Sequence, residues 1–235
     1  MSFCGVVFDL DGTMVDNMSF HVEAFAIFAQ RHGLPPLDMA QRARFDGRRN
    51  REIFPDLLGR ELSDAEQTGF ADEKESLYRE LSRGRLEPMP GLARLLDLLD
   101  AQGVGVAIAT SAPAENVPHS LGEMGLRDRI TRIARSGQVG RGKPFPDVFL
   151  AAARLLECDP EQCLAFEDAP LGVVAARAAG MTCVAITTSF DREAMLAAGA
   201  EPHAAVADFE EYIEKWGEWL LPRGGARNDT PRTPV

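Results

Sequence analysis

Three features are missing from this sequence of 235 residues: a long apolar run, an excess of basic side chains and a basic N-terminal segment. Without a run of about 18 or more apolar residues, no stretch is expected to span a membrane. The formal net charge of -11 argues against general binding to nucleic acids or anionic membranes, which requires clustered positive charge. Because a secretory signal peptide begins with basic residues, we expect a cytoplasmic protein with neither nucleic-acid nor membrane partners.

Cysteines are also few, and no two of them form a C-x-x-C pair. Three lie in apolar, strand-like runs, where a thiol usually packs as a small buried side chain. A cytoplasmic protein keeps such thiols reduced. We therefore predict free thiols, rather than a disulfide or a metal site, at Cys4, Cys158, Cys163 and Cys183.

Strand and helix patterns alternate through the second part of the chain. Apolar strand patterns occur at 6–8, 104–109, 131–134, 163–166, 182–186 and 204–206. Helical periodicity occurs at 92–101, 114–124, 147–156, 171–179, 191–198 and 209–220. This alternation predicts the α/β class, with a Rossmann-like, mostly parallel sheet and helices on both of its faces.

The stretch after the first strand pattern shows helical periodicity only. Shorter helical patterns occur near 20–32, 37–45 and 51–58. A capping box, Ser63-x-x-Glu66, then begins a longer helix. A separate helical unit is therefore expected between the first strand and the alternating region.

These patterns predict how the chain divides into domains. An α/β core is expected at 1–17 and 86–222, with a small α-helical domain inserted at 18–85. The remaining residues, 223–235, are rich in Pro, Gly, Arg and Thr, and we predict that they form a disordered tail.

The most informative stretch is Phe8-Asp9-Leu10-Asp11-Gly12-Thr13, at the end of the first strand pattern. Residues two apart in an extended segment point the same way, so Asp9 and Asp11 are expected to face one crevice. Open α/β sheets bind ligands at the carboxyl ends of their strands, and Gly12 allows the sharp turn that follows. The alternative interpretation is a strand that ends in an ordinary Asx turn.

Three further segments carry polar residues at strand ends or just before helices. They are Thr110-Ser111-Ala112, Gly142-Lys143-Pro144 and Glu167-Asp168. Hydroxyls before a helix and a lysine held by prolines suit a phosphate, and adjacent carboxylates suit Mg²⁺. Taken alone, each segment is also typical of an ordinary cap or a solvated turn.

Together, the four segments favour a single site. If the strand ends converge, the four carboxylates share a crevice, where they repel one another and raise their pKa values. A divalent cation together with Lys143 would offset most of this charge. A phosphate ester would then be held by the cation, Lys143, Thr110 and Ser111.

In their order along the chain, these motifs resemble those of the haloacid dehalogenase superfamily of phosphotransferases. Within it, the chain is most similar to the β-phosphoglucomutase-like phosphatases. The stretches that carry this similarity are Lys143-Pro144-x-Pro146-Asp147, Phe166-Glu167-Asp168, Gly172 and Ala175-Ala176. The resemblance extends over residues 3–215, and it implies that the helical domain at 18–85 is a cap.

The resemblance also implies a role for each motif residue. Asp9 would be the nucleophile that forms an aspartyl-phosphate, and Asp11 would act first as general acid and then as general base. The phosphoryl oxygens would be held by Thr110 and Lys143, with Ser111 and Ala112 as neighbouring substrate contacts. Mg²⁺ would be held by Asp9, the Asp11 carbonyl, Glu167 and Asp168.

The predicted cap departs from the pattern of the mutases in this subgroup. Those enzymes grip a second phosphate with an arginine in a Gly-x-x-Arg stretch, whereas this chain has Gly47-Arg48-Arg49-Asn50. The candidate substrate contacts here are therefore Arg48, Arg49 and Asn50, with Arg51 as a possible substitute. His21 matches a histidine of the mutases, and it either orients Asp11 or lies on a helix surface.

These residues predict a Mg²⁺-dependent phosphatase whose partner is a small phosphorylated metabolite. The alternative is a sugar-phosphate mutase of the β-phosphoglucomutase type, which Asn50 disfavours. A haloacid dehalogenase, which needs no Mg²⁺, is disfavoured by Asp11 and by Glu167-Asp168. A phosphate-binding module without catalysis is disfavoured by the complete set of motif residues. The sequence carries no prediction of the oligomeric state.

Overall fold

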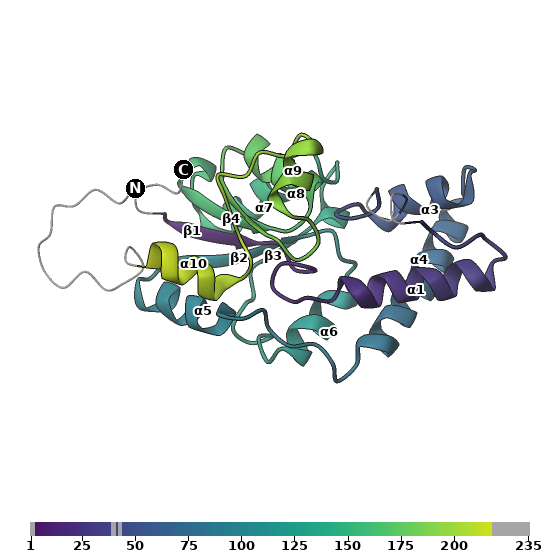
Figure 1. Ribbon diagram of the computed structural model, residues 1–235, viewed down its shortest axis with the longest axis horizontal. Helices are drawn as coiled ribbons and strands as arrows, with labels where there is room; N and C mark the ends of the chain where they lie inside the picture. Colours follow the sequence, from purple (N-terminus) through teal and green to yellow (C-terminus); the bar gives the residue numbers. More distant parts are fainter. Residues whose placement is uncertain (1–2, 39–40, 42–43, 218–235) are drawn as a thin grey trace, which may run out of the picture.

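The computed structural model describes residues 3–38, 41 and 44–217 (Figure 1). Within these residues, six strands form a parallel sheet in the order β3-β2-β1-β4-β5-β6. The strands are β1 (Gly5–Phe8), β2 (Gly105–Thr110), β3 (Ile133–Arg135), β4 (Cys163–Glu167), β5 (Thr182–Ile186) and β6 (Ala204–Val206). The predicted α/β class and parallel sheet are confirmed, and β1 lies at the centre, between β2 and β4.

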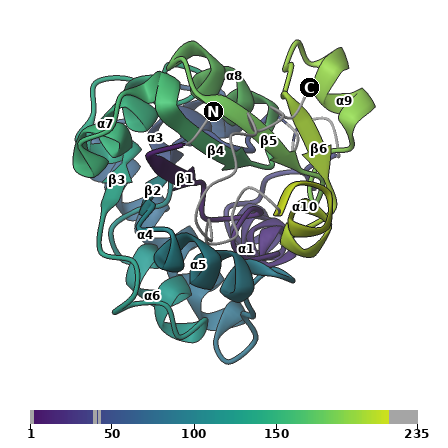
Figure 2. The same cartoon turned by 90° about the vertical axis from the view of Figure 1, so that its left-hand side faces the viewer.

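Apolar side chains of β1 alternate between the two faces of the sheet. The helices that cover these faces include α5 (Leu92–Ala101), α6 (Asn116–Glu123), α7 (Asp147–Leu156), α8 (Pro170–Ala178), α9 (Arg192–Ala197) and α10 (Phe209–Trp216). Val6 and Phe8 pack in the core cluster that contains α5 and α10, whereas Val7 packs against α7 and α8. Figure 2 shows these two pairs of helices on opposite sides of the sheet. Burial on both faces explains the continuous apolar runs of the central strands.

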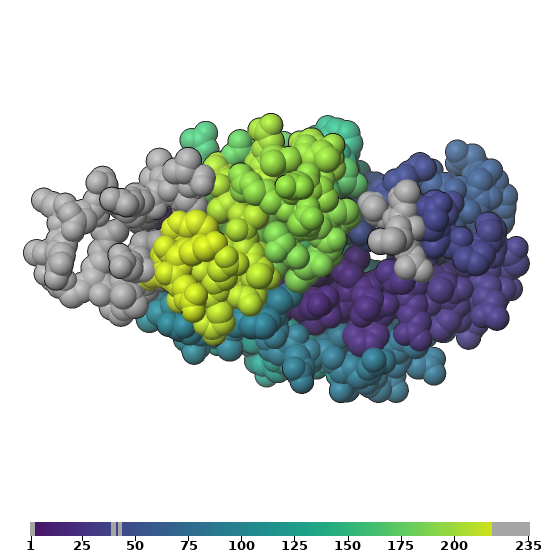
Figure 3. Space-filling view, in the orientation of Figure 1, coloured from purple at the N-terminus to yellow at the C-terminus, as the bar shows by residue number. Residues whose placement is uncertain are grey.

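Among the described residues, three helices lie between β1 and α5 and extend to one side of the sheet (Figures 1 and 3). They are α1 (Met18–Arg31), α3 (Asn50–Leu58) and α4 (Asp64–Ser82), and residues 18–82 are called the helical segment below. Its interior is aromatic: the rings of Phe28, Phe54 and Phe70 lie 5.1–6.0 Å apart between centroids. The predicted capping box at the start of α4 is present.

The two segments that connect the helical segment to the core lie side by side. Val15 forms an isolated antiparallel bridge with Pro88, and the Met89 N–H donates to the Met14 carbonyl at 2.8 Å. The segment therefore leaves and re-enters the core at one place, next to the loop that carries Asp11.

Parts of the sequence prediction fall outside the described residues. These parts are the tail at 223–235 and the end of the helix predicted at 209–220. The helical piece predicted at 37–45 lies partly outside them, and residues 44–47 form a turn rather than a helix. None of the described helices combines the length and the apolar character needed to cross a membrane.

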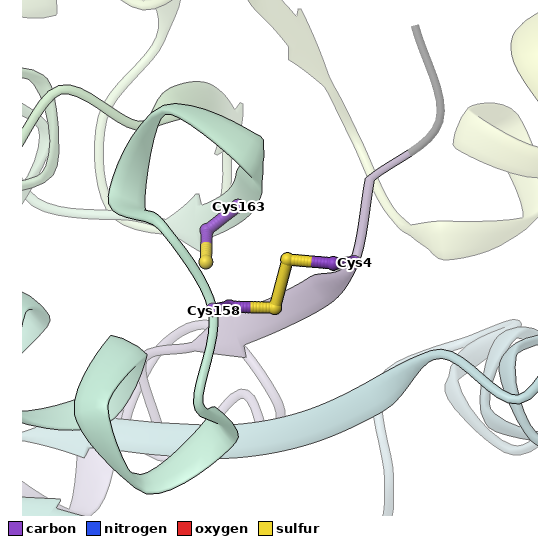
Figure 4. Close-up of side chains that lie close together, drawn as sticks. All are labelled: Cys4, Cys158 and Cys163. Atoms are coloured by element: carbon purple, nitrogen blue, oxygen red, sulfur yellow. A yellow bond between two sulfur atoms is a disulfide. The ribbon is translucent and has the colours of Figure 1, made fainter.

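The prediction of free thiols is wrong for two of the four cysteines. Cys4 and Cys158 form a disulfide across 154 positions of sequence, while Cys163 and Cys183 are buried free thiols (Figure 4). Parallel pairing of β1 with β4 brings together the segments that precede these two strands, and the Cys4 N–H donates to the Gln162 carbonyl at 3.0 Å. Only this long-range pairing makes the two cysteines neighbours, so local spacing carried no signal for them.

Candidate active site

The loop after β1 places two carboxylates at the carboxyl end of the sheet. The Asp9 N–H donates to the Phe166 carbonyl at 2.9 Å, which continues the pairing of β1 with β4 and leaves Asp9 buried. Gly12 follows with a φ of 82°, and a Cβ at this position would lie 2.1 Å from Asp168 Oδ2. Glycine therefore allows the turn both its backbone conformation and its close approach to the loop after β4.

The polar strand ends converge as the sequence predicted. β2 ends at Thr110 and β4 ends at Glu167, while Lys143 comes from the loop before α7. One pocket, called the strand-end pocket below, is lined by Asp9, Asp11, Thr110, Ser111, Ala112, Lys143, Glu167 and Asp168. These segments therefore meet in one place, as the interpretation of a single site requires.

Lys143 is buried against two of the carboxylates. Its Nζ contacts Asp9 Oδ1 at 2.5 Å and also contacts Glu167 Oε1. Burial alone would lower the pKa of the lysine, but the charges of Asp9 and Glu167 raise this pKa above its ordinary value. Lys143 is therefore a fixed positive charge in the pocket.

Negative charge exceeds positive charge around this lysine. Burial raises the pKa of Asp9 to about 8, although Lys143 opposes the shift. Burial and the charges of Glu167 and Asp9 also raise the pKa of Asp168, which accepts a hydrogen bond from Ser189 Oγ at 2.5 Å. These shifts are those of a carboxylate cluster with too little positive charge, an arrangement that fits a hard divalent cation.

Asp11 has the opposite shift. Although burial acts to raise its pKa, the nearby His21 side chain and a hydrogen bond from Asn17 lower the pKa below the ordinary value. Asn17 Nδ2 donates to Asp11 Oδ1 at 2.7 Å, and His21 Nε2 lies 3.9 Å from Asp11 Oδ2. Without a bound substrate, these surroundings keep Asp11 ionised, which is the form that can accept a proton as a general base.

His21 is partly buried rather than exposed on a helix surface. Its side chain is 12% exposed, and its ring stacks on Tyr78 with 3.9 Å between centroids. Lys74 Nζ, which is a donor only, lies 2.8 Å from His21 Nδ1. The imidazole proton therefore sits on Nε2, the nitrogen that faces Asp11. This geometry favours the interpretation in which His21 orients Asp11.

The two candidate arginines of the helical segment are already paired. Arg48 donates to Asp56 Oδ2 at 2.8 Å and to the Glu52 carbonyl at 2.7 Å. Arg49 forms an ion pair with the Glu52 carboxylate and donates to the Ser136 carbonyl at 3.2 Å. Arg48 lines the strand-end pocket, but Arg49 is not one of its lining residues.

Glu75 organises the wall of the pocket that the helical segment contributes. Its Oε1 accepts from Asn50 Nδ2 at 2.8 Å and from Lys74 Nζ at 2.9 Å, and its Oε2 accepts from Asn116 Nδ2 at 2.6 Å. Although burial opposes it, the charge of Lys74 and the hydrogen bonds from Asn50 and Lys74 lower the pKa of Glu75 to about 2. Because Asn116 belongs to α6, this carboxylate also joins the helical segment to the core.

Two further hydrogen bonds cross from the helical segment to the core. Ser111 Oγ donates to the Gly47 carbonyl at 2.8 Å, so Ser111 is engaged by the helical segment. The Tyr78 hydroxyl lies 3.2 Å from Ser120 Oγ on α6. The helical segment is therefore docked over the pocket.

Several polar residues of the site were missed in the sequence. Thr188 Oγ1 donates to the Gly12 carbonyl at 2.5 Å, and the neighbouring Ser189 bonds to Asp168. These two hydroxyls follow the strand pattern at 182–186, so the strand-end signal that singled out Thr110 was present there too. Asn17, Glu75 and Asn116 lie at or in helices in ordinary sequence contexts, and only packing reveals them.

Comparison with known proteins shows which family this chain resembles. The sequence pattern of the haloacid dehalogenase-like hydrolases matches residues 6–186. Validoxylamine A 7'-phosphate phosphatase from Streptomyces hygroscopicus subsp. limoneus is 32% identical over 213 residues, which cover 87% of this chain and 93% of that protein. The β-phosphoglucomutase of Bacillus subtilis is 32% identical over 189 residues, which cover 77% of this chain and 82% of that enzyme.

The fold comparison agrees with the sequence comparison. A crystal structure of a haloacid dehalogenase family IA hydrolase from Entamoeba histolytica superposes with a TM-score of 0.81 and 27% identity. The superposition covers 94% of this chain and 99% of the other. The similarity therefore includes the helical segment as well as the sheet.

Proposed function

This chain belongs to the haloacid dehalogenase-like hydrolases and is a phosphoric monoester hydrolase, and on this premise we propose that it hydrolyses a small phosphorylated sugar or a similar metabolite. The observation that carries the proposal is the convergence of Asp9, Asp11 and Thr110 with Lys143 in one pocket. The printed name of the Streptomyces relative, a phosphatase, supports the same reaction class.

In the proposed reaction, Asp9 attacks the phosphorus atom, and the bond from phosphorus to the leaving oxygen breaks. Asp11 gives its proton to that oxygen and later takes a proton from the water that hydrolyses the aspartyl-phosphate. A carboxylate nucleophile thus divides one difficult displacement into two easier ones. Lys143 and Thr110 hold the phosphoryl oxygens and offset the charge that develops on them.

The donor set of the pocket fits Mg²⁺. Carboxylate and carbonyl oxygens are the ligands that this ion prefers, and we propose that Asp9, Glu167, Asp168 and the Asp11 carbonyl hold it. When bound, the ion supplies positive charge that screens the approach of a carboxylate to a phosphate dianion. The raised pKa values of Asp9 and Asp168 support this need for a second cation beside Lys143.

The alternative of a sugar-phosphate mutase requires a cationic grip on a second phosphate, best supplied by a bidentate arginine. Arg48 and Arg49 are both paired with carboxylates, and Arg51 is exposed on α3. Lys74 is engaged by His21 and Glu75. These pairings favour release of the product and hydrolysis, although the Bacillus relative is named as a mutase.

We propose that residues 18–85 act as a cap on a core made of 1–17 and 86–222. The paired connections at Val15 and Pro88 are suited to a hinge, and closure would exclude bulk water from the pocket. The net charge of -11 supports a small metabolite, rather than a nucleic acid or an anionic membrane, as the partner. A cytoplasmic location stays a prediction.

Phosphate release from a panel of sugar phosphates and other esters tests the proposed function. Activity should require Mg²⁺, disappear with a chelator and return when Mg²⁺ is restored. Rapid quenching with a ³²P-labelled ester should trap label on the wild-type chain and none on Asp9→Asn. Turnover that persists in chelator, or label retained on Asp9→Asn, contradicts the proposed mechanism.

A second assay separates phosphatase from mutase. The chain is incubated with β-glucose 1-phosphate and a catalytic amount of glucose 1,6-bisphosphate. We expect inorganic phosphate to be the main product. Accumulation of glucose 6-phosphate much faster than inorganic phosphate would replace the phosphatase with the mutase.

A further inference from the structure

Asp46 lines the strand-end pocket, but neither the proposed metal ligands nor the phosphoryl contacts include it. It belongs to the turn 45–48, which is closed by a backbone hydrogen bond of 3.0 Å between its end residues. Gly47 supplies the positive φ of 80° that the third residue of such a turn can require. Because Ser111 donates to the Gly47 carbonyl, the turn is anchored to the loop after β2, beside the phosphoryl contacts.

The Asp46 carboxylate is half-buried and accepts no hydrogen bond from any described residue. Burial raises its pKa to about 6, although the charge of Lys74 opposes the shift. Glu75 lines the same pocket, accepts three hydrogen bonds and has a lowered pKa. The protein therefore satisfies one pocket carboxylate of the helical segment and leaves the other available to a ligand.

The two described cations of the helical segment that line the pocket, Lys74 and Arg48, are engaged by other groups. Lys74 contacts His21 Nδ1 and Glu75 Oε1, and its Nζ lies 4.5 Å from the centroid of the Phe25 ring. Arg48 is paired with Asp56 at 2.8 Å. Asn50 and Asn116, which also line this wall, carry neutral amides. The wall that faces the leaving group is therefore neutral to negative, unlike the phosphoryl end with Lys143.

Building on the proposed phosphatase function, we propose that Asp46 selects the leaving group, by accepting a hydrogen bond from a substrate hydroxyl or ammonium and by rejecting leaving groups that carry a second anion. The substrate class is then the phosphate monoesters of non-anionic polyols, either plain or amino-substituted. A hydroxyl supplies only a donor, whereas an ammonium adds charge attraction. A carboxylate or a second phosphate in this place meets a like charge, and the described cations of the helical segment that line the pocket are already engaged, which weakens binding.

Ligand binding to a non-hydrolysing chain tests the proposal without depending on turnover. Calorimetry on Asp9→Asn with Mg²⁺, near neutral pH, compares two matched pairs: glucosamine 6-phosphate with glucose 6-phosphate, and 6-phosphogluconate with sorbitol 6-phosphate. The first pair differs in an ammonium or a hydroxyl on one ring carbon, and the second pair, both open chains, differs in a carboxylate or a hydroxymethyl group at the end opposite the phosphate. We expect 6-phosphogluconate to bind at least about tenfold more weakly than sorbitol 6-phosphate, a difference of about 1.4 kcal/mol. Tighter binding of glucosamine 6-phosphate would identify an amino-substituted polyol as the preferred form.

Adding Asp46→Asn to the same chain should reduce the discrimination against 6-phosphogluconate by about tenfold, since it removes the charge and keeps the shape. The matched control is Asp72→Asn, which removes an exposed carboxylate from α4 of the same segment and should leave the binding ratios unchanged. Asp46→Ser replaces Asp46→Asn if the latter does not fold.

Two results overturn the inference: equal binding of the anionic and neutral esters by the Asp9→Asn chain, or ratios that Asp46→Asn does not change. Failure of the proposed function has a different signature. In that case the wild-type chain releases no phosphate from any ester, whatever the order of the binding constants.

Discussion

The two ends of the strand-end pocket differ in how far their charged side chains are paired. At the sheet, four carboxylates surround Lys143, and burial raises the pKa of Asp9 and of Asp168. At the helical segment, Glu75 is matched by Lys74 and two amides, and its pKa is lowered. The first end is electrostatically incomplete without a ligand, while the second is nearly complete within the protein.

This difference suggests that the sheet end of the pocket carries out the reaction, while the helical end selects the substrate. Charges left uncompensated at the sheet can act on any phosphoryl group that arrives there with a cation. In the helical segment, the paired charges of Glu75 and Lys74 fix the shape of the pocket wall. Asp46 accepts no hydrogen bond from a described residue there and remains available to contact the leaving group. Substitutions at the two ends should therefore fail in different ways, and the following tests are ordered by the size of the expected effect.

The largest effect is expected from Asp9→Asn. An amide is a far weaker nucleophile than a carboxylate, so phosphate release should fall by about 10⁴-fold or more, as it does when other enzymes lose a nucleophile. Circular dichroism should be unchanged and ligand binding retained, because asparagine keeps the shape of the side chain and an oxygen that can face the cation. If Asp9→Asn turns over at a rate near that of the wild type, the sheet end of the pocket does not carry out the reaction as proposed.

Asp11→Asn should slow turnover by roughly 10²–10⁴-fold, the usual contribution of general acid–base catalysis. Esters with poor leaving groups should suffer most in the step that forms the aspartyl-phosphate, because only they need the proton. Single-turnover measurements with p-nitrophenyl phosphate and with a sugar phosphate distinguish this role. Equal losses for both esters would assign Asp11 to positioning rather than to proton transfer.

Glu75 should make the stability of the chain depend on pH. Its pKa falls from 4.5 to about 2 on folding, so its contribution is fully present above pH 4.5 and is lost as the pH falls toward 2. A shift of this size corresponds to roughly 3 kcal/mol. Urea unfolding at several pH values should show wild type exceeding Glu75→Gln near pH 6, with the gap narrowing in acid.

The control for that experiment is Glu80→Gln, which alters an exposed carboxylate on the same helix. Its difference from wild type should be small at every pH. A gap between wild type and Glu75→Gln that stays constant from pH 6 to pH 3 would show that shape, and not charge, is what Glu75 contributes.

The smallest effect is expected from Ser111→Ala. This substitution removes the hydrogen bond from Ser111 Oγ to the Gly47 carbonyl, which contributes about 0.5–1.5 kcal/mol to holding the helical segment in place. We expect KM for a sugar phosphate to rise by a few-fold, with a smaller change for p-nitrophenyl phosphate. Ser76→Ala, on the exposed side of α4, is the matched control. A loss of kcat comparable to that of Asp11→Asn would place Ser111 in the chemistry instead.

The sheet end of the pocket was predictable because it depends on local pattern and on one topological rule. Apolar runs give parallel strands, and polar residues at the carboxyl ends of such strands must meet. Asp9, Thr110 and Glu167 were therefore found from short stretches of sequence. Ser189 obeys the same rule and was overlooked only because the rule was not applied to the strand at 182–186.

The helical end of the pocket was far less predictable, because its contacts join residues on different helices. Nothing near Glu75 in the sequence indicates Asn50 or Asn116 as its partner, since each contact depends on how α4 packs on α3 and α6. The disulfide between Cys4 and Cys158 was missed for the same reason. Periodicity predicts which face of an element is buried, but it does not identify the partner across the interface.

The pairing of Val15 with Pro88 has a consequence for the history of such a chain. An insertion whose two ends meet at one point can be lengthened, shortened or exchanged while β1 still finds β2 and β4, because closing a longer loop adds little free energy. During evolution, the inserted segment can therefore be replaced, which changes the substrates that the protein accepts while the catalytic loops stay the same.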